Sequence, residues 1–197
     1  MIDIDQLLEL GATYKSYSTN DMIFMEGTEC HYYYQLLSGS VRWVQIGEDG
    51  KEFVHDMIEP GECFGEFPLF DGQPYAASAF ANSGSVVLRL PKDTFQQLLR
   101  DQPEIHAQFS RLLVERLRFR FLISKDLAGN KPTDKICSLL SYYKTHKKYF
   151  CNKCNQVQLT RQQIADMTGL RVETVIRSIR QLEVVGRLQI QKGKVYY

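Results

Sequence analysis

The stretch at residues 159–183, LTRQQIADMTGLRVETVIRSIRQLE, carries the strongest fold signal in the chain. Thr160 is a good helix N-cap because its hydroxyl can accept a free backbone N–H, and Gln163 stands at the capping-box position. Gly169 suits a tight corner, where the backbone needs a positive φ. The pattern predicts two helices joined by a short turn, as in a helix-turn-helix unit.

The second helix of this pair separates its residues by face. Val175, Ile179 and Leu182 recur at i, i+4 and i+7, so we expect them to pack inward. The opposite face suits a DNA major groove, because Arg can donate two hydrogen bonds to guanine and Glu can accept one from cytosine. The predicted base-reading residues are Arg171, Val172, Glu173, Ile176 and Arg177. The predicted phosphate contacts, which set register without reading sequence, are Thr160, Arg161, Thr174 and Arg180. The alternative is a surface helix whose Glu and Arg side chains pair with each other.

The surroundings of this motif favour the same function. Gly186 should end the second helix, and the runs at 188–190 and 195–197, with Gly193 between them, predict a β-hairpin wing. Residues 131–197 hold 13 Lys/Arg against 4 Asp/Glu, whereas residues 1–130 hold 11 against 19. Such asymmetry indicates a polyanion partner for the basic part. Nucleic acid is the usual polyanion, since neutralised phosphates release counterions, although charge alone does not specify double-stranded DNA. A basic face without a partner is the alternative.

The N-terminal part has the sequence pattern of an antiparallel β domain. After a short helix at 3–10, short apolar runs alternate with glycine-containing turns between residues 14 and 90. This pattern predicts a sandwich or small barrel, and Asp49-Gly50 is a good hairpin signal. The expected strands lie at 22–25, 32–37, 41–45, 53–58 and 86–90.

A long helix is expected from Glu104 to about Asp126, after a shorter one at 93–100 that is interrupted near Pro103. One apolar stripe on this helix consists of Ile105, Phe109, Leu112, Phe119 and Ile123, and a second of Leu113, Leu117 and Phe121. A helix with two apolar faces needs two covering surfaces. We expect its own β domain to cover one and the same helix of a second subunit to cover the other. A single helix deep in a monomer's core is the alternative.

The segment between this long helix and the predicted helix-turn-helix, which we call the reader, shows a less regular pattern. Residues 128–132 suggest a linker, and Thr133 is expected to cap a further helix that runs to about Thr145. A lysine-rich stretch that contains two cysteines follows. Residues 157–159 are then expected to form a short strand before Thr160.

The reader motif resembles the winged helix-turn-helix of the Crp/Fnr family, in the run 160–165, in Gly169 and in the run 172–177. The order of parts is similar over nearly the whole chain. The resemblance implies an α+β fold with a double-stranded β-helix (jelly-roll) sensor domain at 1–102. It further implies a dimerisation helix at 103–128 and a winged helix-turn-helix at 131–197. Family members read pseudo-palindromic sites as dimers under an effector, and RNA polymerase is an expected partner.

Within that resemblance, the positions of Glu173 and Arg177 read bases. Val172 replaces the arginine of the cyclic-AMP receptor branch, so the run 172–174 is similar to the Fnr-like branch. Ile176 stands where a small residue is usual.

Residues 65–74, GEFPLFDGQP, resemble the family's phosphate-binding cassette. There a glutamate holds the ribose hydroxyl and a downstream Arg-Ser/Thr pair holds the cyclic phosphate. Glu66 is in place, but Tyr75 and Ala76 replace the pair.

A buried phosphate without a cation carries a large desolvation cost, which bidentate arginine usually offsets. Ordinary cyclic-AMP binding is therefore not expected, and the effector is unknown. Tyr75 should either fill the vacated space or contact a less charged effector. The alternative function is a cyclic-nucleotide sensor that binds cyclic AMP or cyclic GMP through a non-standard cassette. The residues of this candidate effector pocket are Gly65, Glu66, Phe67, Tyr75 and Ala76.

No metal site is assigned from the sequence. Cys151 and Cys154 form one CxxC pair with His146 upstream, which supplies only part of a tetrahedral zinc site. A redox dithiol and two unreacted thiols in a loop are the alternatives. Candidate haem ligands are Cys30, His31 and Cys63, although single residues of these types are more often packed in a core.

The sequence argues against other function classes. It contains no GxGxxG or P-loop motif and no nucleophile–base–orienter set, so an enzyme is not expected. It contains no apolar run near the ~20 residues of a membrane helix and no basic start of a signal peptide. We therefore expect a cytoplasmic protein without membrane contact.

Overall fold

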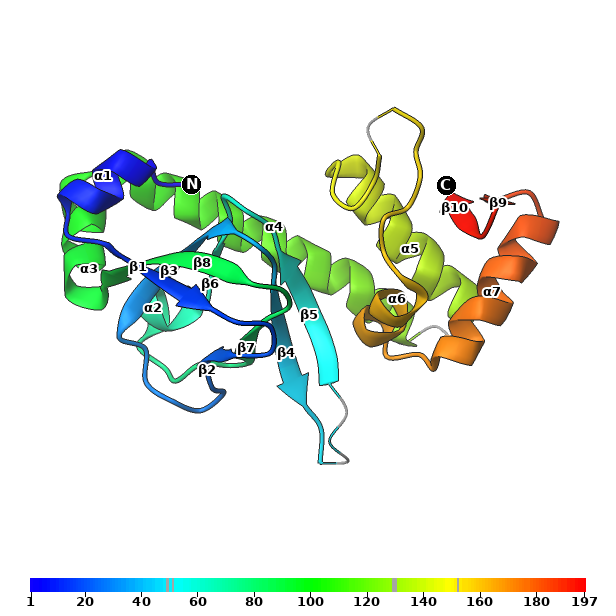
Figure 1. Cartoon of the computed structure of the whole chain (residues 1–197), viewed down its shortest axis with the longest axis horizontal. Coiled ribbons are helices and arrows are strands. Elements are labelled where there is room, and N and C mark those ends of the chain that lie inside the picture. The colour runs from blue at the N-terminus through cyan, green and yellow to red at the C-terminus, as the bar shows by residue number, and fades with distance from the viewer. Residues whose placement is uncertain (49, 51, 129–130, 152) are drawn as a thin grey trace. The chain divides into compact units, whose positions relative to one another are not determined.

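A computed structural model of the protein describes residues 1–48, 50, 52–128, 131–151 and 153–197. The chain divides into two compact units, Met1–Leu112 and Leu113–Tyr197. Figure 1 shows the β-rich character of the first unit and the helical character of the second. Among the helices of the described residues, none is long and apolar enough to cross a bilayer.

Two four-stranded antiparallel sheets build the first unit, with strand orders β1-β8-β3-β6 and β2-β7-β4-β5. Because sheet neighbours come from distant parts of the sequence, the chain crosses repeatedly between the sheets, as in a jelly roll. The predicted fold class is confirmed. The strands are β1 (Thr13–Tyr17), β2 (Met22–Phe24), β3 (Tyr32–Ser38), β4 (Val41–Ile46), β5 (Glu52–Ile58), β6 (Cys63–Phe64), β7 (Ser78–Ala81) and β8 (Ser85–Pro91).

All five predicted strands are present, and three further strands were not predicted. β1 is an edge strand that is almost wholly exposed, so it shows no apolar alternation. β6 is only two residues long, and β7 consists of small residues with one Phe. β4 and β5 pair as the predicted hairpin, although Asp49 at its turn lies outside the described residues.

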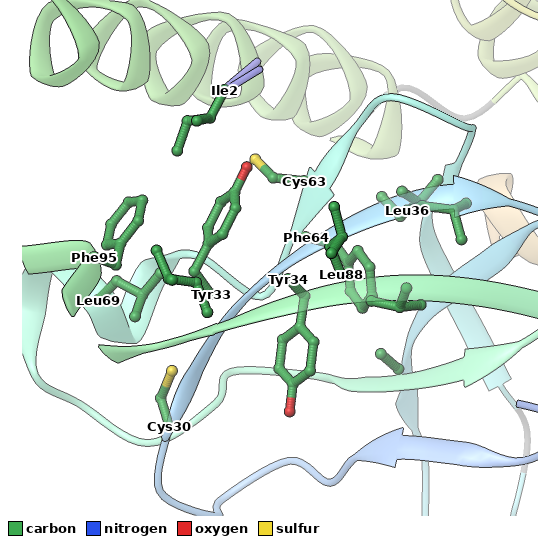
Figure 2. Packing of buried hydrophobic residues seen from close by; sticks show 14 of the residues in the cluster. Ile2, Cys30, Tyr33, Tyr34, Leu36, Cys63, Phe64, Leu69, Leu88 and Phe95 are labelled. Atoms are coloured by element: carbon green, nitrogen blue, oxygen red, sulfur yellow. The ribbon is translucent and has the colours of Figure 1, made fainter. Parts of the chain in front are cut away.

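Four helices pack with these strands or extend from them: α1 (Ile4–Glu9), α2 (Phe67–Asp71), α3 (Lys92–Asp101) and α4 (Pro103–Ala128). The core lies on both sides of β3, where Tyr33 and Tyr34 point in opposite directions (Figure 2). Tyr33 stacks on Phe95 of α3 with ring centroids 4.8 Å apart, and Phe109 of α4 meets its edge at 5.9 Å. This contact anchors the start of α4 on the β-roll.

The two apolar stripes of α4 differ in burial. In the first stripe, Ile105 and Phe109 are buried with the β-roll core, while Phe119 packs on Tyr142 with centroids 4.0 Å apart. In the second, Leu117 and Phe121 are 55% and 70% exposed. The alternative of a helix buried on all sides within one chain is therefore wrong. The side chain of Ile123 lies outside the described residues.

The second unit contains α5 (Pro132–Thr145), α6 (Arg161–Thr168), α7 (Val172–Val184), β9 (Gln189–Gln191) and β10 (Lys194–Tyr196). The prediction that Thr133 caps α5 is wrong, because Lys131 is the N-cap residue and Pro132 occupies the first turn. Proline suits this position, since it has no N–H that needs an acceptor.

The predicted strand at 157–159 is also wrong. Its residues form only an isolated bridge between Val157 and Phe150. Part of the predicted linker at 128–132 lies outside the described residues.

Candidate DNA-binding surface and effector pocket

The corner between α6 and α7 is built by local hydrogen bonds. The Gln163 N–H donates to the Thr160 hydroxyl at 3.1 Å, and the Thr160 N–H donates to the Gln163 side-chain oxygen at 2.8 Å. This reciprocal capping box starts α6 at Arg161. Gly169 ends the helix with φ +67°, a conformation that side chains rarely adopt. The predicted helix-turn-helix corner is confirmed.

Helix α7 presents one face to the core and another to solvent. Val175, Ile179 and Leu182 are 0%, 1% and 4% exposed, as their spacing predicted. The exposed residues of the other face are Arg171, Glu173, Ile176, Arg177 and Arg180, and Val172 and Thr174 are half-buried. Within the described part of the chain, neither Glu173 nor Arg177 forms an ion pair. Their charged groups are thus available to an external partner rather than joined to each other.

Two of the predicted phosphate residues, Thr160 and Arg161, lie at the start of α6 but differ in their surroundings. Thr160 is exposed, while Arg161 is half-buried and donates from its guanidinium to the Gly193 carbonyl at 3.4 Å. Burial lowers the pKa of Arg161 from its usual value. Arg161 therefore ties α6 to the wing.

The wing itself adds two cations that the sequence analysis did not single out. β9 and β10 pair antiparallel, and Lys192 and Gly193 form their turn with φ of +49° and +78°. Lys192 and Lys194 are both exposed. The run Lys-Gly-Lys at a hairpin turn was the signal that could have marked them, because lysine is a common phosphate contact.

In the β-roll, the candidate cassette is filled by aromatic side chains. Tyr75 is 4% exposed and stacks on Phe24 with ring centroids 3.9 Å apart and planes inclined by 9°. Its backbone is held on both sides. The Tyr75 N–H donates to the Thr28 carbonyl at 3.0 Å, and the Gly27 N–H donates to the Tyr75 carbonyl at 2.8 Å. Tyr75 therefore fills the interior, which is the first of the two outcomes expected for it.

The aromatic cluster, which consists of Phe24, Tyr34, Phe64 and Tyr75, leaves no room at the cassette glycine. A Cβ at Gly65 would lie 2.5 Å from Phe24 Cζ and 3.1 Å from Tyr75 Cε1. Burial raises the pKa of Tyr34 and of Tyr75, and a hydrogen bond with the Cys30 thiol raises the pKa of Tyr75 further. A setting that disfavours phenolate ions also disfavours a phosphate anion.

The other candidate pocket residues divide in two groups. Glu66 is fully buried beside Gly65, and Phe67 packs on Trp43 with ring centroids 5.0 Å apart. Ala76, by contrast, is exposed, and its carbonyl accepts from the Gln45 side chain at 3.1 Å. The structure thus brings Gly65 and Tyr75 together in the interior, with Glu66 buried next to them, and leaves Ala76 at the surface.

Comparison with known proteins decides the family. The cyclic nucleotide-binding domain model matches residues 14–102, and the Crp-like helix-turn-helix domain model matches residues 134–196. The cAMP-activated global transcriptional regulator CRP of Pasteurella multocida (strain Pm70) is 31% identical over 169 residues, 85% of this chain and 81% of that protein. This chain belongs to the Crp/Fnr family. It is a DNA-binding transcription regulator and not an enzyme.

Further comparisons give one more curated relative of the Crp/Fnr regulator and two solved structures that share its fold. A CRP-like cAMP-activated global transcriptional regulator of Mycobacterium tuberculosis (strain ATCC 25618 / H37Rv) is 26% identical, covering 88% of this chain and 78% of that protein. The c-di-GMP responsive regulator CLP of Xanthomonas campestris shares the fold with a TM-score of 0.76 at 22% identity, covering 98% of both chains. A CooA mutant from Carboxydothermus hydrogenoformans shares it with a TM-score of 0.80 at 17% identity, covering 100% of this chain and 87% of that one.

Among the residues that the structure describes, the cysteines of the Crp/Fnr regulator belong to no group that could hold a metal ion. In the described ranges, no three His, Cys, Asp or Glu residues come together in a way that could hold an ion. His146 lies with its ring centroid 4.2 Å from that of Tyr142. Cys151 and Cys154 lie in a turn, and Cys30 and Cys63 are buried in the β-roll core.

Proposed function

We propose that the regulator reads a pseudo-palindromic DNA site as a homodimer, with one copy of α7 in the major groove of each half-site. The observation that carries the proposal is the division of α7 into a buried face and an exposed face with unpaired charges. On that face we assign base reading to Arg171, Val172, Glu173, Ile176 and Arg177. We assign phosphate contacts to Thr160, Arg161, Thr174 and Arg180, joined by the wing lysines.

A second copy of the chain is the proposed cover for the exposed stripe of α4. Val114, Leu117 and Phe121 are 51%, 55% and 70% exposed and recur at i, i+3 and i+7. The smaller exposed residues Ala107 and Ser110 continue the same three–four spacing towards the N-terminus. This spacing is that of a coiled-coil seam. It supports a dimerisation helix at 103–128 between a sensor domain at 1–102 and a reader domain at 131–197.

We further propose that the sensor domain responds to an effector other than a cyclic nucleotide held through its phosphate. Tyr75 occupies the interior, and the aromatic cluster around it disfavours a buried anion. The second candidate, a cyclic-nucleotide sensor, is favoured by the domain match over residues 14–102 and by relatives named as cAMP-activated. RNA polymerase is the proposed protein partner of the DNA-bound dimer.

Selection of bound sequences from a random pool of double-stranded DNA with the full chain tests the reading mode. We expect enrichment of an inverted repeat whose half-site centres lie one helical turn apart, about 10 base pairs or 34 Å. Light scattering of the complex should give two chains per duplex. Enrichment of a single unrepeated site with one chain bound would overturn the dimer proposal, and no enrichment would overturn sequence reading.

Isothermal titration of the full chain with cyclic AMP and with cyclic GMP separates the two sensor candidates. We expect no saturable heat with either nucleotide, because no arginine stands in the cassette to offset the phosphate charge. Saturation at micromolar concentration would establish the cyclic-nucleotide sensor instead.

A further inference from the structure

We propose that Cys151 and Cys154 form a reversible disulfide when a hydroperoxide reaches the loop at residues 146–156, which leads into the DNA reader. The disulfide itself is independent of the proposed DNA site, whereas its effect on DNA binding rests on the proposed function.

Backbone hydrogen bonds bring the two cysteines close to each other. The Cys154 N–H donates to the Cys151 carbonyl at 3.4 Å, and the Asn155 N–H donates to the same carbonyl at 3.0 Å. A turn closed in this way keeps its first and fourth Cα atoms within about 7 Å. Disulfide-linked residues have Cα atoms about 4.4–6.8 Å apart, so the bond needs only a local adjustment.

Both thiols can be reached from solvent, unlike the other three cysteines. Cys154 is exposed and Cys151 half-buried, whereas Cys30, Cys63 and Cys137 are buried. The Cys151 sulfur accepts hydrogen bonds from the Cys154 thiol and from the N–H groups of Lys153 and Cys154, which lower the pKa of the Cys151 thiol. Cys151 is therefore the nucleophile of the pair, because the thiolate is the reactive form.

The chemistry follows the usual oxidation steps of a dithiol. The Cys151 thiolate attacks one peroxide oxygen, the O–O bond breaks, and the other oxygen leaves as water or an alcohol after protonation. The Cys154 sulfur then attacks the resulting sulfenic acid, so that an S–S bond forms, the S–O bond breaks and water leaves. Two electrons pass from the two sulfurs to the peroxide. An external dithiol returns them by thiol–disulfide exchange.

The loop is fastened directly to the reader. The Cys151 N–H donates to the Gln156 carbonyl at 2.9 Å, and the Val157 N–H donates to the Val195 carbonyl of β10 at 2.8 Å. Gln156 also forms a bridge with Tyr196 in the wing. A bond that fixes the turn at 151–154 therefore acts on β10, the wing strand that begins at the exposed Lys194.

The experiment uses the reduced full chain, treated with hydrogen peroxide and then with N-ethylmaleimide, and read by peptide mass spectrometry. We expect peroxide to remove two of the five alkylatable thiols. These two should be found as one disulfide between Cys151 and Cys154 of the same chain, which dithiothreitol reduces again. Cys154→Ser should stop at a sulfenic acid on Cys151 that dimedone traps. Cys137→Ser, a matched change of a buried thiol in the same unit, should leave the reaction as in the wild type.

Three results would overturn the proposal. The first is a pair that stays fully alkylatable under peroxide, and the second is a disulfide that joins different chains. The third is bound zinc that protects both thiols in the reduced protein, which would assign the pair to a metal.

DNA binding gives the second measurement. We expect the affinity for a selected site to differ at least threefold between oxidised and reduced wild type, and not to differ in the Cys151→Ser/Cys154→Ser double variant. If the disulfide forms but oxidised and reduced wild type bind the DNA site equally tightly, only the proposed coupling to the wing is overturned, and the disulfide itself stands. Loss of all sequence-specific binding in the reduced protein would count against the proposed function instead.

Discussion

At the scale of single residues, Tyr75, which stands where the resembled cassette has an arginine, places its ring in the interior of the β-roll. It lies face to face with Phe24 at 3.9 Å, between backbone hydrogen bonds to residues 27 and 28. Gly65 is required beside it, because a Cβ there would meet the Phe24 ring. The interior next to the cassette glycine is therefore aromatic and apolar in this chain.

The buried phenol of Tyr75 makes a prediction for alkaline solution. Burial, followed by the hydrogen bond with Cys30, raises its pKa in the folded state, whereas in the unfolded chain it ionises near pH 10. Above about pH 10 the unfolded state has therefore lost a proton that the folded state keeps, and the free energy of unfolding falls as pH rises. Tyr75→Phe should make this fall shallower by up to about 1.4 kcal/mol per pH unit. Denaturant titrations between pH 7 and about pH 11 measure it.

Tyr14→Phe, at an exposed position, controls for the loss of a phenol as such. Because burial also raises the pKa of Tyr34, part of the decrease in unfolding free energy at high pH should remain in every variant. Equal pH slopes for Tyr75→Phe and the wild type would contradict the raised pKa.

Arg177 carries the sharpest test of base reading. Arg177→Ala should weaken binding to a selected site by about 1–3 kcal/mol and relax the preference at one base position. Fluorescence anisotropy with selected and random duplexes measures both effects. Arg100→Ala, an exposed arginine of the sensor unit, serves as the control. An equal loss on random and selected DNA would show that Arg177 contacts phosphate rather than a base.

At the scale of elements, the start of α6 combines folding and binding in one residue. Thr160→Ala removes the cap hydrogen bond to Gln163 and should cost about 1 kcal/mol of stability. Thr160→Asp keeps a good cap but adds a negative charge where a phosphate is expected. We therefore expect the Asp variant to melt near the wild-type temperature and to bind DNA less tightly. Unchanged DNA affinity in Thr160→Asp would remove Thr160 from the phosphate contacts.

The exposed stripe of α4 predicts the oligomeric state. Leu117→Glu places a charge at the centre of the proposed seam, so sedimentation velocity should show a shift from dimer to monomer. The helix should stay folded, because Leu117 is 55% exposed in the single chain. Arg118→Ala, at the next and also exposed position, should remain dimeric. A Leu117→Glu variant that dimerises as well as the wild type would move the interface to another face.

At the scale of the whole molecule, charge is divided between the two parts of the sequence. The 13 Lys/Arg against 4 Asp/Glu in residues 131–197 face a polyanion in the proposed function. The logarithm of the DNA binding constant should fall linearly with the logarithm of salt concentration, by about 0.9 for each neutralised phosphate. Arg180→Ala should reduce that slope by about 1. An unchanged slope would show that Arg180 contacts no phosphate.

The local elements of the fold were predictable because their signals lie within a few residues. The capping box of Thr160 and Gln163, the positive φ of Gly169 and the inward spacing of Val175 each depend on neighbours in one or two helical turns. Strands with apolar alternation were predicted for the same reason. β1 was not, because an exposed edge strand has no apolar face to reveal it.

By itself, the sequence determined the helix-turn-helix, its wing and the order of parts, since hydrogen bonding and periodicity over short distances specify them. Only the tertiary structure decided that Tyr75 stacks inside the β-roll, that one α4 stripe is covered while Leu117 stays exposed, and that the CxxC turn is fastened to β10. The physical reason is that burial and long-range hydrogen bonds depend on which distant segments meet, and no local pattern records that meeting.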